Sequence, residues 1–528
     1  MKISEKLRAP FKRRRELKEA QAKSIYPMLM PRFELRLNLE FLLLNMPCLN
    51  QILLPLGLGY VEKIFQAAGA DFQIFDVNID FYHRYHATRL FTQEKLPRLP
   101  GGEVVGDPWA SHEFTRWGDS EFLALFDPWC EELLDELAQN PPRFVGFSIN
   151  PLSAPMSKRF VARLRERLPQ VKIFAGGSSC FYASGARKLL NDFDFVFVGE
   201  SENSLAEFLR RARAGGALRD LPGVLSRHDS PEHEWQPAEP PTELDKIGFP
   251  TYDYVSDLKV YRTFNGVLNA AINPSRGCVW SRCRFCNERL SYRSRPAQKV
   301  FEELAMLHRR GAQVVMLSES DSNGTPDILR EFAELIIRHQ LKLQLWGQLR
   351  IHKANTVEYM KTLRRAGLTR ITFGVDGWSD SLLRLQNKGY TMKMVEENLR
   401  AGREANIRTG VNIVVGVPGE TDEMVQEACE NLARLAPLID RVDNLTALML
   451  GVGSVYWLDP AAYKIKFRIP AEEAADGRNI INNANWYSEE PYIDADIRSE
   501  RLERFRAAMR ESGLTASKFG ELLTDFRK

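Results

Sequence analysis

The sequence predicts an α/β protein with two successive series of strands and helices, each organised around its own parallel sheet. Two observations predict the two series: short apolar runs alternate with amphipathic segments from residue 31 to about 227, and the same alternation returns from 265 to 460. A third observation is that three of the seven cysteines lie close together near the start of the second series. Strands that are separated by helices at this spacing pair in parallel.

The first series contains five apolar runs that predict buried strands: FLLLNMPC at 41–48, FQIFDVN at 72–78, FVGFSIN at 144–150, VKIFAGG at 171–177 and FVFVGE at 195–200. Residues 33–41 alternate apolar and charged side chains, which predicts a half-buried strand before the first run. Residues 80–140 are less regular and predict an insertion with one amphipathic helix at 127–139. Together they predict a doubly wound, flavodoxin- or Rossmann-like parallel sheet over residues 31–227.

Small and polar residues follow four of these strands, at the edge of the sheet where ligands of such folds bind. They let a flat ligand approach the backbone closely, although tight packing explains any single glycine-rich turn equally well. Four such turns on one edge favour a binding site. The candidate residues are Leu54, Pro55, Gly57, Ser148, Asn150, Gly176, Gly177, Gly199 and Glu200.

The second series predicts six strands, at 267–272, 313–320, 341–350, 370–377, 409–420 and 442–450, with helices between them. Proline and charged residues predict a linker between the two series, at 228–264. A basic extension precedes both series at 1–30, and a C-terminal segment at 461–528 carries the amphipathic helix SERLERFRAAMRES. We expect this last segment to pack on the second sheet; contact with substrate at the mouth of the sheet is the alternative.

The clustered cysteines Cys278, Cys283 and Cys286 have the spacing Cys-x4-Cys-x2-Cys and directly follow the first strand of the second series. Three thiolates on one loop can hold three corners of a 4Fe-4S cluster and leave the fourth iron open. Zinc is the alternative, but it would need a fourth ligand, and no further Cys or His occurs before His308.

This loop resembles the cluster loop of the radical S-adenosylmethionine (SAM) superfamily, whose usual spacing is Cys-x3-Cys-x2-Cys with an aromatic residue before the last cysteine. Phe285 occupies that aromatic position, and the first gap is one residue longer than usual. A loop can take up one extra residue as a bulge. The resemblance implies that residues 265–460 form an open (β/α)6 partial TIM barrel with its site at the carboxyl ends of the strands.

The resemblance also implies where SAM binds. Besides Phe285, it assigns Ser318 and Ser320 of the SESDSN stretch to the SAM amine, Arg350 to the carboxylate and Asp376 to the ribose. The stretch IVVGVPGE resembles the adenine-contacting motif of the family and contributes Val414, Gly416 and Glu420. The alternatives are a helix-capping loop for the two serines and buried salt bridges for Arg350 and Glu420.

The first series, together with LPGVLSR and LDKIGFPTYDY (244–254), resembles the cobalamin-binding domain that precedes many radical SAM domains. That family commonly binds the corrin without a histidine ligand. Consistent with this, no Asp-x-His-x-x-Gly stretch is present. A domain that no longer binds cobalamin would lack it too.

The resemblances together imply a cobalamin-dependent radical SAM enzyme, with a methyltransferase acting on an unactivated carbon or phosphorus centre as the first choice. Its cofactors would be a 4Fe-4S cluster, SAM and cobalamin, with an electron donor of the flavodoxin or ferredoxin type as partner. Cyclisation, oxidation or rearrangement without methyl transfer is a second reading. A methylthiotransferase, whose second cluster would have to use Cys48, Cys130 and Cys180, and a zinc- or B12-binding module without catalysis complete the alternatives.

Composition excludes some classes of protein. A formal net charge of +3 over 528 residues gives no reason to expect nucleic acid as a partner. Four scattered cysteines suit a reduced, cytoplasmic protein. We expect no transmembrane segment, because polar residues interrupt the apolar stretch 37–60. The substrate is left as a small molecule, a lipid or a peptide, and no residue is assigned as a catalytic acid or base.

Overall fold

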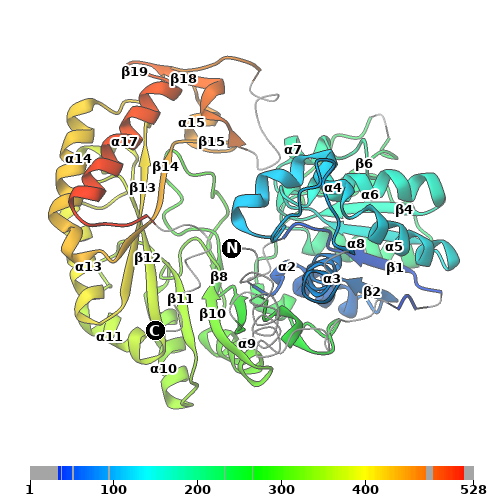
Figure 1. Cartoon of the computed structure of the whole chain (residues 1–528). Coiled ribbons are helices and arrows are strands. Elements are labelled where there is room, and N and C mark those ends of the chain that lie inside the picture. Colours follow the sequence, from blue (N-terminus) through cyan, green and yellow to red (C-terminus); the bar gives the residue numbers. More distant parts are fainter. Residues whose placement is uncertain are drawn as a thin grey trace, which may run out of the picture. The chain divides into compact units, whose positions relative to one another are not determined.

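The computed structural model describes residues 34–36, 38–49, 53–92, 95–230, 232–263, 266–470 and 480–516. They form two compact units: the first unit comprises residues up to 242 with 246–269, and the second unit comprises 243–245 with 270 onward (Figure 1). Each unit has its own sheet. The predicted N-terminal extension, 1–30, lies outside the described residues.

The first unit contains a six-stranded sheet in the order β2-β1-β3-β4-β5-β6. Its strands are β1 (Phe41–Leu44), β2 (Phe72–Phe75), β3 (Phe144–Ser148), β4 (Lys172–Gly176), β5 (Phe195–Phe197) and β6 (Val224–Ser226). The first five pair in parallel, which confirms the predicted sheet. β6 pairs antiparallel with β5, as edge strands of such sheets often do.

The prediction of a strand at 33–41 is wrong for the described part of that stretch, because only Phe41 belongs to β1. Side-chain amides satisfy the backbone of residues 34–36. Gln73 accepts a hydrogen bond from the Arg36 N–H at 3.1 Å and donates one to the Glu34 carbonyl at 2.8 Å. Asn140 donates to the Arg36 carbonyl at 2.9 Å.

Helices cover both faces of this sheet (Figure 1). On one face, α2 (Leu56–Ala67) and α8 (Glu202–Arg213) bury apolar side chains such as Phe65 and Phe208 in a core with the strands. On the other face, Phe160 of α6 (Ala154–Arg167) packs against Phe147 of β3, with ring centroids 6.2 Å apart. The apolar side chains of the strands therefore need no solvent-facing side, as expected for a parallel sheet.

The insertion between β2 and β3 contains more helix than the sequence predicts. The predicted helix is present as α5 (Asp127–Gln139), and α4 (Ser120–Ala124) precedes it. The sequence prediction missed α3 (Val77–Phe91), which begins where the Asp76 carboxylate accepts the Ile79 N–H. Polar residues of α3, including Asn78, Asp80 and His83, are buried beneath the insertion, so the helix lacks one clean apolar stripe.

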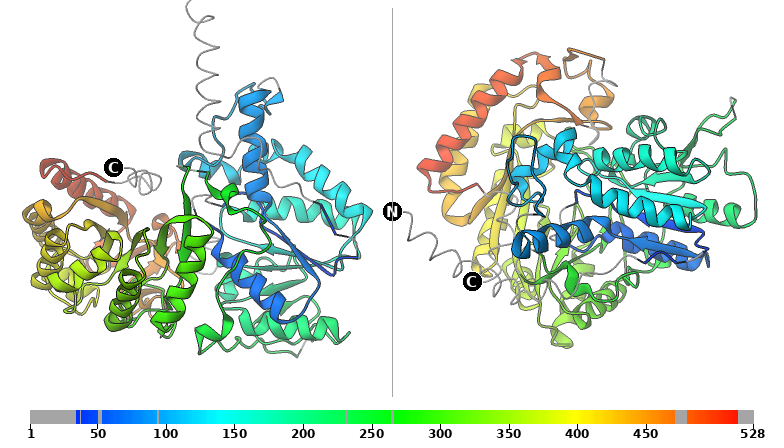
Figure 2. Two further views of the ribbon diagram at one scale, coloured as in Figure 1. Left: turned by 90° about the horizontal axis from the view of Figure 1, so that it is seen from below. Right: turned by 45° about the vertical axis from the view of Figure 1, so that its right-hand side comes forward.

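The second unit contains a curled six-stranded sheet in the order β14-β13-β12-β11-β10-β7, which confirms the predicted half-barrel. The strands are β7 (Leu268–Ile272), β10 (Ala312–Leu317), β11 (Gln344–Leu349), β12 (Leu368–Asp376), β13 (Arg408–Val415) and β14 (Arg441–Ala447). The helices that connect them are α9 (Ala297–Arg309), α10 (Pro326–Arg338), α11 (Val357–Arg365), α12 (Asp380–Leu385), α13 (Met392–Glu404) and α14 (Asp422–Leu435). They line the outer face of the sheet (Figures 1 and 2).

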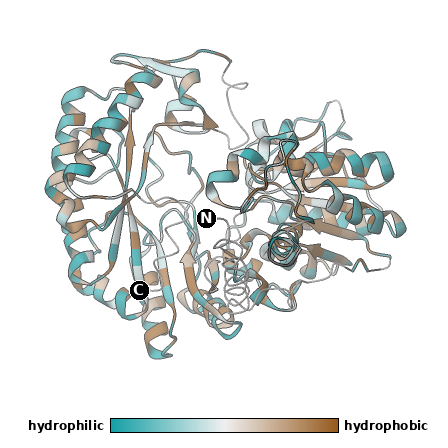
Figure 3. Ribbon diagram, in the orientation of Figure 1, coloured by the Kyte–Doolittle hydropathy of each residue, from teal (hydrophilic) through white to brown (hydrophobic). Residues whose placement is uncertain are grey.

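Local sequence signals set where these helices begin. Thr356, Thr391 and Thr421 each accept the backbone N–H three residues later, at the starts of α11, α13 and α14. The helices carry polar residues on their outer sides, whereas the strands mix apolar and polar residues (Figure 3). Within the described ranges, no helix combines the length and the apolar character that crossing a bilayer would require.

The C-terminal segment adds several short strands and a long helix to the half-barrel. β16 (Ile465–Phe467), β18 (Trp486–Glu489) and β19 (Tyr492–Ile493) form an antiparallel sheet. α17 (Ala495–Glu511) is the predicted amphipathic helix and begins at Asp494, which caps its first turn. It packs along α14 and reaches β13 and β14, so the C-terminal segment is part of the second unit.

Candidate active site

The three clustered cysteines lie on a loop that is closed at its base. β8 (Ser275–Arg276) and β9 (Arg293–Ser294) pair antiparallel and bring the two ends of the loop together. The loop therefore leaves the half-barrel directly after β7 and returns to it directly before α9. Because β7 is a strand of the sheet, Cys278, Cys283 and Cys286 lie at the carboxyl end of the strands, where sites of such barrels form.

The extra residue between Cys278 and Cys283 is taken up in a left-handed turn. Ser281 has a φ of 44°, an uncommon value for a residue with a side chain. Its hydroxyl donates to the Glu288 carbonyl at 3.1 Å, and the Arg289 guanidinium donates to the carbonyls of Ser281 and Cys283. These hydrogen bonds connect the segment between Cys278 and Cys283 to Glu288 and Arg289 on the opposite side of the loop.

A second segment, residues 385–389 between α12 and α13, supports the loop from the side. Trp280 Nε1 donates to the Asn387 carbonyl at 2.6 Å, and the Asn387 amide donates to the Arg282 carbonyl at 2.9 Å. Arg284 donates through its backbone to Gln386 O at 3.0 Å and through its guanidinium to Leu385 O at 2.9 Å. We call residues 385–389 the support segment.

The arrangement of the cysteines suits an iron–sulfur cluster better than a zinc ion. In a 4Fe-4S cluster three thiolates from one loop bind three irons and leave the fourth open, which these three cysteines can do without a further ligand. A structural zinc ion would need a fourth protein ligand. Burial raises the pKa of all three thiols, that of Cys286 to about 11, and bound iron would supply the charge that keeps them ionised.

A buried ion pair lies beside the cysteines. Lys388 of the support segment places Nζ 2.5 Å from the Asp376 carboxylate, and the two side chains are only 8% and 11% exposed. Burial by itself lowers the pKa of Lys388, but the charges of Asp376 and Cys283 contribute to raising it well above the usual range. The Lys388 ammonium also lies 5.4 Å from the centre of the Phe285 ring. Asp376, the predicted ribose ligand, is therefore held by a lysine that sequence reasoning did not single out.

The predicted ligands of the SAM amine lie on the loop after β10. Ser318 directly follows β10 and is hydrogen-bonded to the end of β7. Its N–H donates to Ile272 O at 2.8 Å, and its carbonyl accepts from the Asn273 side chain. The Ser320 hydroxyl donates to Glu288 at 3.0 Å. Between them lies Glu319, whose buried carboxylate faces the Ser322 hydroxyl. Burial raises its pKa well above the usual range.

Glu319 thus offers what an ammonium group needs, a buried carboxylate. It belongs to the SESDSN stretch that sequence reasoning assigned to the amine, although only Ser318 and Ser320 were named as ligands. The signal was present, because an acid in a loop directly after a buried strand is a candidate ligand for a cation at the carboxyl end of a parallel sheet.

Arg350 directly follows β11, as predicted for a ligand of a carboxylate. Its guanidinium stacks 4.7 Å from the centre of the Trp280 ring and donates to the Lys388 carbonyl at 2.9 Å. Burial raises the pKa of Asp321, and the charge of Arg350 opposes part of that rise. The Asp321 carboxylate lies 3.6 Å from the Cys278 sulfur. Arg350 therefore links the cysteine loop to the support segment, and no salt bridge of the kind weighed as its alternative is formed with the described acids.

At the end of β13 the structure places Val414, Gly416 and Glu420 together. Val414 is 8% exposed, and Gly416 has a φ of 74°, which glycine adopts without strain. The buried Glu420 carboxylate accepts the Gly416 N–H at 2.8 Å and pairs with Arg501 of α17 at 3.1 Å. The salt bridge weighed as the alternative role of Glu420 is therefore present.

In the first unit, the predicted ligand-binding residues lie at adjacent strand ends. Ser148 and Gly176 end β3 and β4 and are paired in register, and Gly199 and Glu200 follow β5. Leu54 and Pro55 precede α2, which carries Gly57 in its first turn. The sheet order makes these ends neighbours, so the structure brings the predicted residues to one edge.

The glycines at this edge of the sheet differ in how much space surrounds them. A Cβ on Gly57 would meet nothing within 4 Å, and on Gly176 or Gly199 it would meet only one atom, at 3.7 or 3.8 Å. The space beside these three glycines is compatible with a flat cofactor that lies close to the backbone. Gly177 is different, because a Cβ there would lie 2.6 Å from Ile149 O, so internal packing explains that residue. Asn150 caps the following turn by accepting the N–H groups of Leu152 and Ser153.

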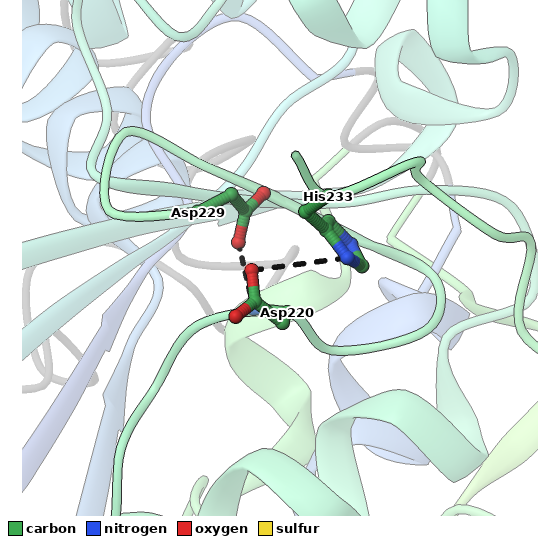
Figure 4. Close-up of side chains that lie close together, drawn as sticks. All are labelled: Asp220, Asp229 and His233. Atoms are coloured by element: carbon green, nitrogen blue, oxygen red, sulfur yellow. Dashed lines mark hydrogen bonds and ion pairs between the residues drawn. The ribbon is translucent and has the colours of Figure 1, made fainter. Parts of the chain in front are cut away.

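Asp220, Asp229 and His233 form a second cluster, on the loops that flank β6 (Figure 4). Its carboxylates are already occupied. Asp220 accepts the backbone N–H and the hydroxyl of Ser230, and Asp229 accepts the backbone N–H groups of Asp220 and Ser226. Because all four carboxylate oxygens take part in these bonds, the cluster fastens two loops together, and we assign it no metal.

The cysteines outside the loop do not resemble a second cluster site. Cys130 lies on α5, Cys180 follows β4 and Cys48 follows β1, and all three are buried. Burial raises the pKa of Cys130 and of Cys180 to about 12. Such thiols are typical of packed structural residues.

Comparison with known proteins agrees with this geometry. Residues 272–432 match the model of the radical SAM superfamily. The chain is 28% identical over 329 residues to the anaerobic magnesium-protoporphyrin IX monomethyl ester cyclase of Synechocystis sp., a match that covers 60% of this chain and 64% of the relative. The chain thus spans less than two thirds of that relative's length.

Two solved structures share the fold over most of the chain. The radical SAM methyltransferase TsrM from Kitasatospora setae, with cobalamin and a 4Fe-4S cluster bound, covers 90% of this chain and 89% of its own at 16% identity, with a TM-score of 0.61. The cobalamin-dependent radical SAM enzyme OxsB, with aqua-cobalamin and SAM bound, covers 89% of this chain and 66% of its own at 14% identity, with a TM-score of 0.64. The cysteine loop and strands β10 to β13 lie within the segment that matches the radical SAM superfamily.

Proposed function

We propose that this chain is a cobalamin-dependent radical SAM enzyme that transfers a methyl group to an unactivated carbon or phosphorus centre. Three observations together support the proposal. The cysteine triad has a spacing that suits a 4Fe-4S cluster, and glycines with open space around them lie at one edge of a second sheet. The solved structure of TsrM covers 90% of this chain.

Under this proposal the chain's own residues have distinct tasks. Cys278, Cys283 and Cys286 hold the cluster, and Glu319 and Arg350 bind the amine and carboxylate of SAM. The end of β13 contacts its adenosine. The strand ends of the first unit hold the corrin. Bound together, the cofactors supply a 5′-deoxyadenosyl radical and a transferable methyl group, and an external flavodoxin- or ferredoxin-type protein supplies the electron.

A second candidate is ring closure, oxidation or rearrangement with the same cofactors and no methyl transfer. The observation that favours it is the match with a relative named as a cyclase, at 28% identity. A methylthiotransferase has less support, because Cys48, Cys130 and Cys180 are buried on separate elements. A zinc-binding module has less support because a structural zinc ion needs a fourth ligand, and no further Cys or His follows Cys286 before His308.

Anaerobic reconstitution with iron, sulfide and hydroxocobalamin tests the cofactors. We expect about four irons and one cobalt per chain, and release of 5′-deoxyadenosine from SAM after chemical reduction. Cys278→Ala should abolish the iron, whereas Cys429→Ala, on α14 outside the loop, should keep it. Zinc in place of iron in the purified protein, or a full iron content in Cys278→Ala, would refute the assignment.

The products separate the two reactions. Methyl transfer consumes two SAM molecules per turnover: one yields methionine and 5′-deoxyadenosine, and the other donates its methyl group and yields S-adenosylhomocysteine. Ring closure or oxidation yields 5′-deoxyadenosine without S-adenosylhomocysteine. Formation of both products in equal amounts supports the methyltransferase, and 5′-deoxyadenosine alone supports the second candidate.

A further inference from the structure

The C-terminal helix α17 reaches the end of β13 with two arginines, Arg498 and Arg501. They are one helical turn apart and both are buried, at 0% and 4% exposure. Residues on a helix that only covers a barrel would bury apolar side chains there, because burying a guanidinium is costly unless its partners are well placed. The partners of these two arginines are therefore informative.

Both arginines act on the backbone of one residue, Gly416. Arg498 Nε donates to the Gly416 carbonyl at 3.1 Å. Arg501 pairs at 3.1 Å with the same Glu420 oxygen that accepts the Gly416 N–H at 2.8 Å. The N–H and the C=O of Gly416 are thus both held from α17, the C=O directly and the N–H through Glu420.

The packing around Gly416 leaves no freedom for other arrangements. A Cβ on this residue would lie 2.3 Å from Arg498 Cγ, and its φ of 74° already favours glycine. Trp486 holds the Arg498 side chain in place. The Arg498 guanidinium lies 3.5 Å from the centre of the Trp486 ring and donates to the Trp486 carbonyl at 3.3 Å. Burial lowers the pKa of Arg498 to about 9, which shows that these contacts only partly compensate its charge.

We propose that Arg498 and Arg501 are positioning residues for the adenosine half of SAM: through Gly416 they hold the end of β13 in the shape that receives it. This inference rests on the proposed function, in which the end of β13 contacts adenosine. The methionine half is assigned to Glu319 and Arg350, which follow β10 and β11. Because β12 and β11 separate β13 from β10 in the sheet, the two halves of SAM can be tested separately.

The test uses the full reconstituted chain and compares Arg498→Met with wild type. Methionine keeps most of the apolar stem and removes the hydrogen bond to Gly416. We expect the dissociation constant of SAM, and of S-adenosylhomocysteine as a competitor, to rise about tenfold, equivalent to about 1.4 kcal/mol. Binding of free methionine, followed by the electron paramagnetic resonance signal of the reduced cluster, should stay unchanged, as should iron and cobalt content.

Two further variants keep the test decisive. Arg506→Met makes the same chemical change on the same helix at a side chain that is 51% exposed, and it should bind SAM like wild type. Arg498→Lys retains the charge and one donor, so it should restore part of the affinity, and it decides the outcome if Arg498→Met loses its iron. Unchanged SAM affinity in Arg498→Met, or in Arg498→Lys where Arg498→Met loses its iron, would overturn the inference, as would equal weakening of methionine and SAM. Failure of wild type to bind SAM at all would instead overturn the proposed function.

Discussion

The ion pair between Lys388 and Asp376 gives the sharpest test of how the site is held. Replacing Lys388 with Met removes the ammonium and keeps a side chain of similar length. It leaves the Asp376 carboxylate, which is only 11% exposed, without its cation. We expect this variant to destabilise the second unit strongly, and the double variant Lys388→Met with Asp376→Leu to recover much of the loss.

The magnitude follows from the geometry. With a separation of 2.5 Å and an effective dielectric constant of about 20, the gross attraction is about 6–7 kcal/mol. Taking both groups out of water offsets part of it, so breaking such a pair from one side costs about 3–5 kcal/mol, whereas replacing both partners with apolar residues is often nearly neutral. The coupling energy between the two sites should therefore be about 2–3 kcal/mol.

Urea unfolding of the iron-free protein, followed by tryptophan fluorescence, measures this coupling through a double-mutant cycle. Lys393→Met is the matched control, because its ammonium is 85% exposed and lies 4.0 Å from Glu397. It should change the free energy of unfolding by less than about 0.5 kcal/mol. Additivity of Lys388→Met and Asp376→Leu within about 0.5 kcal/mol would refute the reasoning, because it would mean that the two groups do not interact.

Three other predictions concern separate parts of the chain. Burial raises the pKa of Asp80 to about 7, above its unfolded value, so the folded state binds more protons between these values and the first unit should lose stability as pH rises from about 4 to 7; urea titrations should show a flatter profile for Asp80→Asn, and an unchanged slope would contradict this. Gly389→Ala should lower the iron content, because its Cβ would lie 2.3 Å from the Trp280 ring, whereas Gly513→Ala, with a similar positive φ but open surroundings, should not; equal iron in both variants would contradict the role of the support segment. Added Zn²⁺ or Ca²⁺ should leave the melting temperature of the chain unchanged because the Asp220 and Asp229 oxygens are occupied, and a rise that Asp229→Asn abolishes would reveal a metal site.

Much of the architecture was predictable because strands and helices have distinct periods. The six strands of the half-barrel and five strands of the first sheet coincide with apolar runs of the sequence. The cysteine loop was predictable because its ligands lie within one short stretch. The errors came where tertiary burial overrode the local pattern: α3 buries polar residues such as Asn78 and His83, and Gln73 and Asn140 satisfy the backbone of residues 34–36.

The side chains that surround the site were harder to predict, since their partners are distant in the sequence. Lys388 meets Asp376 twelve positions away and touches Phe285 from a different loop. Arg498 reaches Gly416 across 82 positions. A lysine or arginine in an amphipathic segment has the same local signature whether it is solvated or buried, so the sequence offers no sign of such a pairing.

The sequence by itself determined the class of fold, the cysteine triad and the strand ends at which ligands would bind, because each depends on residues that are close along the chain. Only the tertiary structure decided how the site is held. Ser281 adopts a left-handed conformation within the longer gap of the cysteine loop, and the support segment forms hydrogen bonds with that loop. Arg498 of α17 donates a hydrogen bond to the Gly416 carbonyl. The physical reason is that a buried charge or a strained turn is stable only when groups from several elements compensate it, and chain folding alone brings those groups together.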